Sequence, residues 1–303
     1  MDLSERVIGS VLGLALGDAL GAPFRSRRAH QIPHPLPAFE LPWMGFPPGA
    51  TTDSTAMARS LLGSLLDRAG FDAIDLARRH VGWLATDPPG VNNLTRLVLA
   101  DVRDGQPDAA RAYVEQRGPE VSAGNGSVKY CSPLGAAYAR RPNELAIHAT
   151  ELSAITHWDE RCRTACLAVT LAVAALIRGE PPDRSVLGAV EAVAGREGAE
   201  ELEYLVGEAG RARPIDGPDM GFALFTAGIA LQVATEGLGF EEGLRRVVGS
   251  GGDTDANGAV AGALLGALHG VENLPAAWLQ RLEDRGAIEG EARRLAELSE
   301  GIS

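Results

Sequence analysis

The sequence predicts an all-α protein, folded as a compact orthogonal array of many helices. Hydrophobic residues make up 45% of the 303 residues but aromatic residues only 5%, and 37 residues are glycine. Small and straight-chain residues favour closely packed helices, whereas sheets prefer β-branched and aromatic side chains. Apolar positions recur with the helical period along most of the chain, and no segment shows the alternation typical of a strand. No linker or low-complexity tract interrupts this pattern, so we expect residues 1–303 to form a single domain.

The first helix is expected to begin at Ser4, whose side chain can cap free backbone N–H groups, and to end near Leu20. Gly21 and Pro23 follow it as stop signals. The helices after residue 50 are expected at residues 53–69, 72–85, 92–103, 107–117, 142–156, 159–178, 184–195, 198–211, 219–235, 240–248, 254–270, 274–283 and 287–299.

Residues 22–50 are expected to form an irregular loop, because their seven prolines forbid a continuous helix. So long a connection within a compact domain is usually functional or disordered. Trp43, Met44 and Phe46 give the segment apolar anchors. We therefore expect a partly ordered loop that lies over a pocket.

The net charge of −12 argues against a nucleic-acid partner, since phosphate binding requires clustered Lys and Arg side chains. A nucleic acid is expected only as a modified substrate. The glycine-rich segments 9–21 and 258–270 resemble membrane spans, but Asp18 and His269 interrupt them, so we expect no membrane span.

The three cysteines, Cys131, Cys162 and Cys166, form neither a zinc pattern nor a disulfide framework. An odd number of cysteines behind an N-terminus without a basic leader indicates a reducing compartment. We therefore expect a cytoplasmic protein, and a monomer.

Two acidic motifs stand at expected helix starts, TTDST at residues 51–55 and GGDTDAN at residues 251–257. Ordinary capping explains the first motif taken alone, but in the second it accounts for only one of two aspartates beside a glycine pair. Two carboxylates two residues apart can converge on one hard cation, which prefers oxygen ligands. We therefore predict a Mg²⁺ or Mn²⁺ site made by both motifs. The expected ligands are Thr52, Asp53, Asp253 and Asp255.

Two weaker features lie between the acidic motifs. The turn GNGS at residues 124–127 can point backbone N–H groups at a phosphate or a sugar, although GNG is also a common turn. His157 follows an expected helix; a single histidine is more often structural than catalytic. Asp159 has the position of an ordinary cap for the next helix.

These motifs, in this order and spacing, resemble the ADP-ribosylglycohydrolase family, whose members include the dinitrogenase-reductase-activating glycohydrolase and the ADP-ribosyl-acceptor hydrolases. The resemblance implies the all-helical orthogonal fold of that family. Five collinear blocks carry it: GSVLGLALGDALGAP at 9–23, TDST at 52–55 with Met57, GNGS at 124–127 with PLG at 133–135, SAITH at 153–157, and GGDTD at 251–255 followed by GAVAGALLGALHG.

The resemblance also implies a pocket that accepts ADP-ribose or an ADP-ribosylated protein and hydrolyses the bond at C1 of the terminal ribose. In the family a two-metal cluster holds that ribose and a water. Asp53 would then orient or deprotonate the water, and Asp255 would bridge the metals. The positions expected to contact substrate are Arg25, Asn93, Gly124, Asn125, Gly126, Ser127 and His157.

Four positions depart from the family pattern, all within the expected site. Ser54 and Gly90 stand where the family has aspartate, Arg25 where it has glutamate, and Ala256 where it has threonine. Two adjacent dications need several anionic ligands to offset their repulsion, so these losses favour one ion over two. We hypothesise that the Arg25 guanidinium replaces part of the second ion's charge. The alternative is that Arg25 points outward with its basic neighbours.

The leading interpretation is a metal-dependent hydrolase of an ADP-ribosyl linkage with a reduced metal site. The alternative is a binding protein that senses or sequesters ADP-ribose or a nucleotide without hydrolysing it. A third interpretation, a purely structural member of the family, is disfavoured because packing alone does not require a GGDTD turn.

Overall fold

Fifteen α-helices account for most of the described chain, as the helical periodicity predicts. The structure is a computed structural model, and it describes residues 1–118 and 121–301. The helices are α1 (Leu3–Gly21), α2 (Asp53–Arg68), α3 (Ala73–Leu84), α4 (Asn93–Arg103), α5 (Ala109–Arg117), α6 (Ser132–Ala137), α7 (Pro142–Ala154), α8 (Glu160–Ile177), α9 (Pro182–Ala192), α10 (Ala199–Val206), α11 (Ala223–Ala234), α12 (Phe240–Gly249), α13 (Thr254–His269), α14 (Ala276–Arg281) and α15 (Arg285–Gly301).

Short elements connect these helices. Two strands of two residues each, β1 (Arg27–Arg28) and β2 (Gly251–Gly252), pair antiparallel. The 3₁₀ turns are η1 (Ala22–Phe24), η2 (Ala29–Gln31), η4 (Val128–Tyr130), η5 (Glu208–Ala212) and η6 (Val271–Asn273). The expectation of no strand was wrong at this one place, because a two-residue pairing is too short to show alternation in the sequence.

The remaining differences from the predicted helices have local causes. Helix α6 was not predicted; it is six residues long and Pro133 lies in its first turn. The helix expected from residue 219 begins at Ala223 instead, where the backbone N–H bonds to the carbonyl of Ala123. The helix expected from Ser4 is capped by Asp2, which forms a capping box with Glu5.

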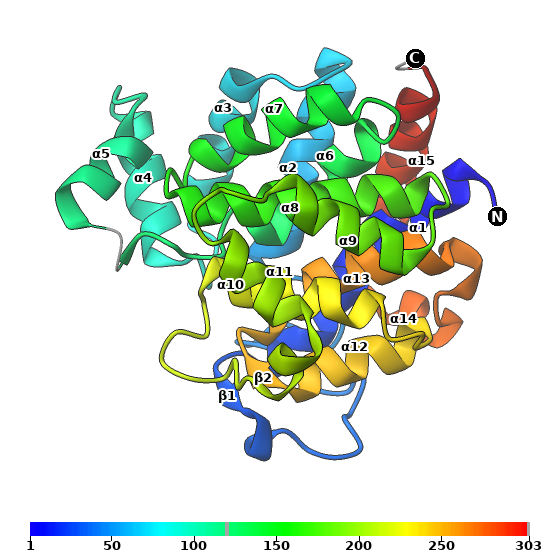
Figure 1. The fold of residues 1–303 in the computed structure, drawn as a ribbon. Helices are drawn as coiled ribbons and strands as arrows, with labels where there is room; N and C mark the ends of the chain where they lie inside the picture. Colours follow the sequence, from blue (N-terminus) through cyan, green and yellow to red (C-terminus); the bar gives the residue numbers. More distant parts are fainter. Residues whose placement is uncertain (119–120, 302–303) are drawn as a thin grey trace.

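The central pair of the fold is made by the two glycine-rich helices, α1 and α13 (Figure 1). They run antiparallel in close contact, because Gly9 of α1 meets Gly266 of α13 and Gly17 meets Gly258. A Cβ atom added to Gly17 would lie 1.9 Å from the carbonyl oxygen of Gly258. The absence of side chains therefore sets how closely these backbones approach.

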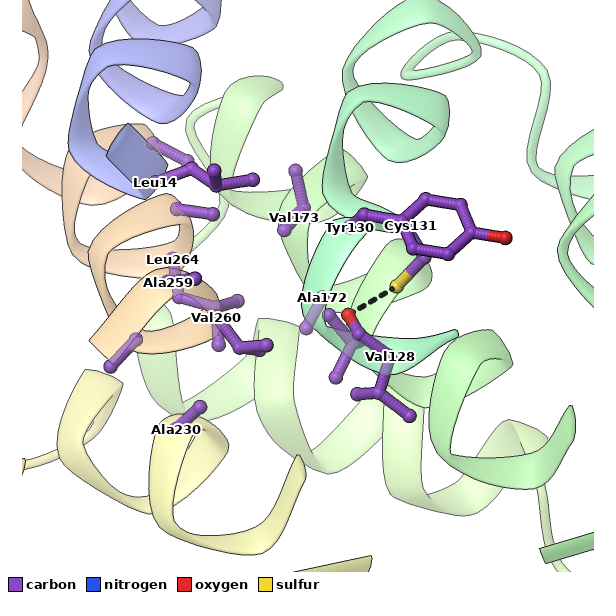
Figure 2. Close-up of a cluster of buried hydrophobic side chains, with 14 of the residues drawn as sticks. Leu14, Val128, Tyr130, Cys131, Ala172, Val173, Ala230, Ala259, Val260 and Leu264 are labelled. Atoms are coloured by element: carbon purple, nitrogen blue, oxygen red, sulfur yellow. Dashed lines mark hydrogen bonds between the residues drawn. The ribbon is translucent and has the colours of Figure 1, made fainter. Parts of the chain in front are cut away.

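The main hydrophobic core surrounds this pair. Figure 2 shows Leu14 of α1 and Leu264 of α13 in one cluster with Val173 of α8. The buried turn η4 joins the same cluster through Val128 and Tyr130. The packing of Val128 and Tyr130 therefore holds the backbone of η4 in place, and with it Lys129, the residue between them.

Helix α1 with the turn η1 is long and apolar enough to cross a membrane by length and composition, which the sequence analysis did not expect. In the structure 94% of that apolar window is buried inside the protein. Its apolar residues pack against α13 and α15, as in the core helix of a folded domain.

The proline-rich segment is irregular, as predicted, and it lines a cavity of about 1010 Å³ against α12. Of its three expected anchors only Trp43 is buried, at 8% exposure. Met44 and Phe46 are exposed, and the ring of Phe46 stacks on the ring of Trp43 across a tight turn.

Candidate functional site

Four carboxylates converge because the ends of three helices meet. Asp18 lies near the C-terminal end of α1, which the antiparallel pairing places beside the start of α13. Asp253 and Asp255 lie at that start, and Asp53 is the first residue of α2. We call Asp18, Asp53, Asp253 and Asp255 the carboxylate cluster.

Asp18 connects α1 to the start of α2 and was not identified as a site residue from the sequence. Its carboxylate accepts hydrogen bonds from the backbone N–H groups of Thr52 and Thr55, at 2.8 and 3.1 Å, and from both threonine hydroxyls, at 2.6 and 2.5 Å. Complete burial raises the pKa of Asp18, and these hydrogen bonds oppose the rise. Thr52 therefore holds Asp18, and its hydroxyl also lies 3.3 Å from Asp255.

The short strand pairing places Arg25 opposite the second acidic motif. Gly251 and Gly252 have φ angles of 74° and 80°, a conformation that favours glycine, and their strand pairs with Arg27–Arg28. The backbone N–H of Ser26 bonds to the Gly252 carbonyl at 2.8 Å. Asp253 directly follows Gly252, and Arg25 directly precedes Ser26. The pairing therefore brings Arg25 close to Asp253.

Arg25 points into the carboxylate cluster, which decides between the two orientations considered from the sequence. Its Nε lies 3.4 Å from Asp253 Oδ1, and its Nη1 lies 3.4 Å from Asp255 Oδ2 and 4.0 Å from Asp53 Oδ1. The side chain is 22% exposed. The neighbouring Arg27 and Arg28, by contrast, are exposed at the surface.

A second cation, Lys129, contacts the cluster at the other carboxylate oxygen of Asp53, and it was not predicted from the sequence. Its Nζ donates to Asp53 Oδ2, and the two side chains are 2% and 0% exposed. Lys129 is the middle residue of the anchored turn η4. The signal that could have identified it is its rarity, because it is the only lysine in the chain.

Asp255 is the carboxylate with the most perturbed environment. Burial raises its pKa well above the usual value; the charge of Asp253 adds to this rise and Arg25 opposes it. Its Oδ1 atom has no hydrogen-bond partner among the described residues, and the same is true of Asp53 Oδ1. Two buried carboxylate oxygens are thus available for a further ligand.

The GNGS turn reaches the cluster through one side chain. Asn125 Nδ2 donates to Asp253 Oδ2 at 2.8 Å and to the hydroxyl of Thr226 at 2.9 Å. That hydroxyl in turn donates to Asn257 of α13. Beside the turn, Gly124 borders a cavity of about 460 Å³.

Two other residues predicted to contact substrate, Ser127 and His157, are buried. The Ser127 hydroxyl is buried against that of Ser153, at 3.0 Å. His157 is 1% exposed and packs against Gly126; burial and the charge of Lys129 lower its pKa to about 3, so the ring is neutral at neutral pH. His157 therefore supports the turn and carries no positive charge for a diphosphate.

Asn93 is exposed, and no contact places it with the cluster. Its neighbour Asn92, not Asn93, lies beside the GNGS turn. Asn92 caps α4 by accepting from the backbone of Thr95, and its Nδ2 lies close to Gly126 of the turn. The need for a helix cap fixes the direction of Asn92 and leaves Asn93 outside.

The model of the ADP-ribosylglycohydrolase family matches residues 1–302. The chain belongs to this family. It is 29% identical over 295 residues to the ADP-ribosyl-[dinitrogen reductase] glycohydrolase of Rhodospirillum rubrum, covering 96% of this chain and 94% of that one. It is 27% identical to the ADP-ribosylhydrolase ARH3 of Bos taurus, covering 92% and 89%. A solved structure titled "ADP-ribosylglycohydrolase-related protein complex" has a TM-score of 0.82 and 30% identity, covering 98% and 99% of the two chains.

Two of the positions expected to depart from the family pattern, Ser54 and Ala256, have a plain structural position. Ser54 is buried, and its hydroxyl lies 3.4 Å from that of Thr52 without reaching Asp253 or Asp255 in any hydrogen bond of the described residues. Ala256 is buried in α13 and offers no polar atom. Neither position adds a negative charge or an oxygen ligand to the cluster.

Metal ions of the kind that the family resemblance implies do not fit the donor set as it is arranged. Asp53, Asp253 and Asp255 supply three negative charges, and Arg25 and Lys129 supply two positive charges in contact with them. Among the residues that the structure describes, no group of three or more His, Cys, Asp or Glu side chains is arranged to hold a metal ion. At 4 Å and an effective dielectric constant of about 20, each unit positive charge would repel a dication by about 8 kcal/mol and each carboxylate would attract it by about as much, so Arg25 and Lys129 would offset the attraction of two of the three carboxylates.

Proposed function

We propose that this protein hydrolyses the glycosidic bond at C1 of an ADP-ribosyl group. The observation that carries the proposal is the pair Asp253 and Asp255 at the start of α13, held beside the GNGS turn by the hydrogen bond from Asn125. Relatives that cover 96% and 92% of this chain are named ADP-ribosyl-[dinitrogen reductase] glycohydrolase and ADP-ribosylhydrolase, which supports the reaction class.

Cleavage of a glycosidic bond passes through a transition state that resembles an oxocarbenium ion, and nearby carboxylates stabilise its positive charge. In the proposed step the oxygen of a water attacks C1, and the bond from C1 to the leaving group breaks. The water's proton passes to a carboxylate, the leaving atom keeps the bonding electrons, and the carboxylate then gives the proton to that atom. We assign the proton acceptor to Asp255, because its raised pKa makes it a stronger base and Oδ1 has no partner among the described residues.

The substrate's remaining groups would be held by residues around the cluster. Arg25 and Asp253 are the more accessible charged groups, with side chains 22% and 13% exposed, and are suited to bind ribose hydroxyls. The cavity beside Gly124 includes Arg161 and the rings of Phe222 and Phe225. Such a combination of cationic and aromatic groups suits a phosphate and a nucleobase.

For Asp53 we propose a role other than orienting or deprotonating the water. Its side chain is fully buried and paired with Lys129, so we assign it to stabilising the charges of the site. The single Mg²⁺ or Mn²⁺ ion expected from the sequence stays a prediction, and the two chain cations argue against it.

The test is release of free ADP-ribose from proteins modified on arginine or serine and from modified nucleic acid, measured with EDTA and with Mg²⁺. We expect release by the wild type and a loss of about 10²-fold or more in Asp255→Asn. Exposed Asp108→Asn is the control and should leave the rate unchanged. Equal rates for Asp255→Asn and the wild type would contradict the assignment.

The second candidate is an ADP-ribose-binding protein without hydrolase activity. The observation that favours it is that all three carboxylates of the two acidic motifs contact a cation of the chain itself. Tight binding of ADP-ribose by calorimetry, with no release from any of the substrates above, would establish this candidate in place of the first.

A further inference from the structure

We propose that two cations of the chain, Arg25 and Lys129, balance most of the negative charge of Asp53, Asp253 and Asp255, so that the site assembles and binds its ligand without a divalent metal ion. The inference rests on the proposed function only for the identity of that ligand. Its structural part concerns which cations balance the buried aspartates.

The contacts account for each carboxylate of the two acidic motifs. The Arg25 guanidinium lies within 4.0 Å of Asp53, Asp253 and Asp255, and Lys129 donates to Asp53. Buried charges need an opposite charge or a metal nearby to offset the loss of solvation. Here each buried aspartate of these motifs already has a partner from the chain.

The choice of lysine at position 129 supports this inference. All 28 Lys and Arg residues of the chain are arginines except Lys129, so the one ammonium group is buried in the cluster. An ammonium is a compact point charge with three donors, whereas a guanidinium is planar and larger. In shape and charge an ammonium is the side-chain group closest to a small cation among oxygen ligands.

The position of Arg25 is also built into the fold. Gly90, with φ of 77°, lies against its guanidinium, and a Cβ atom at position 90 would lie 2.9 Å from Arg25 Nη1. The same Cβ atom would lie 3.1 Å from the buried ring of Trp43. The arginine at 25 and the glycine at 90, both expected departures from the family pattern, therefore lie in direct contact in one arrangement, and the positive φ of Gly90 favours glycine there.

The experiment uses the single lysine as a reporter inside the site. In the protein labelled with lysine that carries ¹³C only at Cε, Lys129 gives one NMR signal, and bound Mn²⁺ would broaden it because the ion is paramagnetic. For the wild type we expect no broadening by equimolar Mn²⁺ and no change in Tm with EDTA or Mn²⁺. Broadening of the wild-type signal, or a lower Tm after EDTA, would overturn the proposal.

Arg25→Glu is the matching variant, since it removes the guanidinium and adds a ligand. We expect Mn²⁺ to broaden its Lys129 signal and to raise its Tm, with affinity at least about ten-fold above that of the wild type. Arg27→Glu makes the same charge change two residues away, at an exposed side chain, and should behave as the wild type. If Arg25→Glu is unstable, Arg25→Ala is measured in the same way. If Mn²⁺ does not broaden the Lys129 signal in the folded Arg25 variants, the role given to Arg25 is overturned.

A separate measurement addresses the ligand. Calorimetry of ADP-ribose with the wild type should give the same affinity in EDTA and in Mn²⁺, whereas a requirement for Mn²⁺ would overturn metal independence. If ADP-ribose does not bind under either condition, the proposed function fails while the Mn²⁺ results on Lys129 still decide which cations balance the cluster.

Discussion

At the residue scale, the site depends on a buried ion pair whose two members are 76 positions apart in the chain. Lys129 and Asp53 are both almost completely inaccessible to solvent. Such pairs add little net stability compared with apolar residues of similar volume, but removing one partner leaves an uncompensated buried charge. The pair therefore makes the site intolerant of single substitutions.

Lys129→Met should lower the free energy of unfolding by about 3–5 kcal/mol, because it leaves the Asp53 carboxylate without its ammonium partner. Chemical denaturation monitored by circular dichroism measures this. The double variant Asp53→Asn with Lys129→Met should recover part of the loss, since no charge is then left unpaired. The exposed pair Arg103 and Asp104 supplies the control, and Arg103→Met should cost less than about 1 kcal/mol. Similar losses of unfolding free energy in Lys129→Met and Arg103→Met would contradict this account.

At the scale of elements, the direction of the α1–α13 pair fixes where the site forms. The antiparallel arrangement brings Gly21, at the end of α1, against Thr254, at the start of α13. Each α-helix start carries free N–H groups and a partial positive charge, which stabilise nearby carboxylates. The starts of α2 and α13 therefore contribute to holding several aspartates in one small volume.

Gly262→Ala should destabilise the protein by about 1–3 kcal/mol or more, because its Cβ atom would lie 2.0 Å from the carbonyl oxygen of Gly13 and force the two helices apart. The matched control is Gly188→Ala on α9, where nothing lies within 4 Å of the new atom. That change should be neutral or stabilising by up to about 1 kcal/mol, as expected for alanine in a helix. Thermal unfolding of both variants measures the difference, and equal Tm values would refute the close-packing argument.

At the scale of the whole molecule, one large hydrophobic cluster includes residues from α1 through α15, and a second, small one lies between α4 and α5. The small cluster contains only Val98, Ala109 and Ala110 as buried members. Figure 1 shows α4 and α5 at one edge of the molecule, away from the central pair. The stability of the fold is therefore expected to differ between these regions.

Amide hydrogen exchange should show α4 and α5 exchanging faster than α1 and α13, because few apolar contacts hold the first pair. The same experiment tests the prediction of a single domain: outside α4 and α5, the most protected amides should share one common free energy of opening. Two groups of core helices with separate opening energies would contradict a single domain.

The monomeric state stays a prediction, which sedimentation would check.

The all-helical class, most helix positions and the two acidic motifs follow from the sequence alone, because helical period, capping residues and glycine turns are local signals. The surroundings of Asp53, Asp253 and Asp255 depend instead on how the chain folds. Arg25 had two equally reasonable orientations, Lys129 showed no local pattern, and the cap of α4 selected Asn92 over Asn93. These outcomes depend on contacts between distant segments, and the energy of a buried charge is set by its neighbours in space.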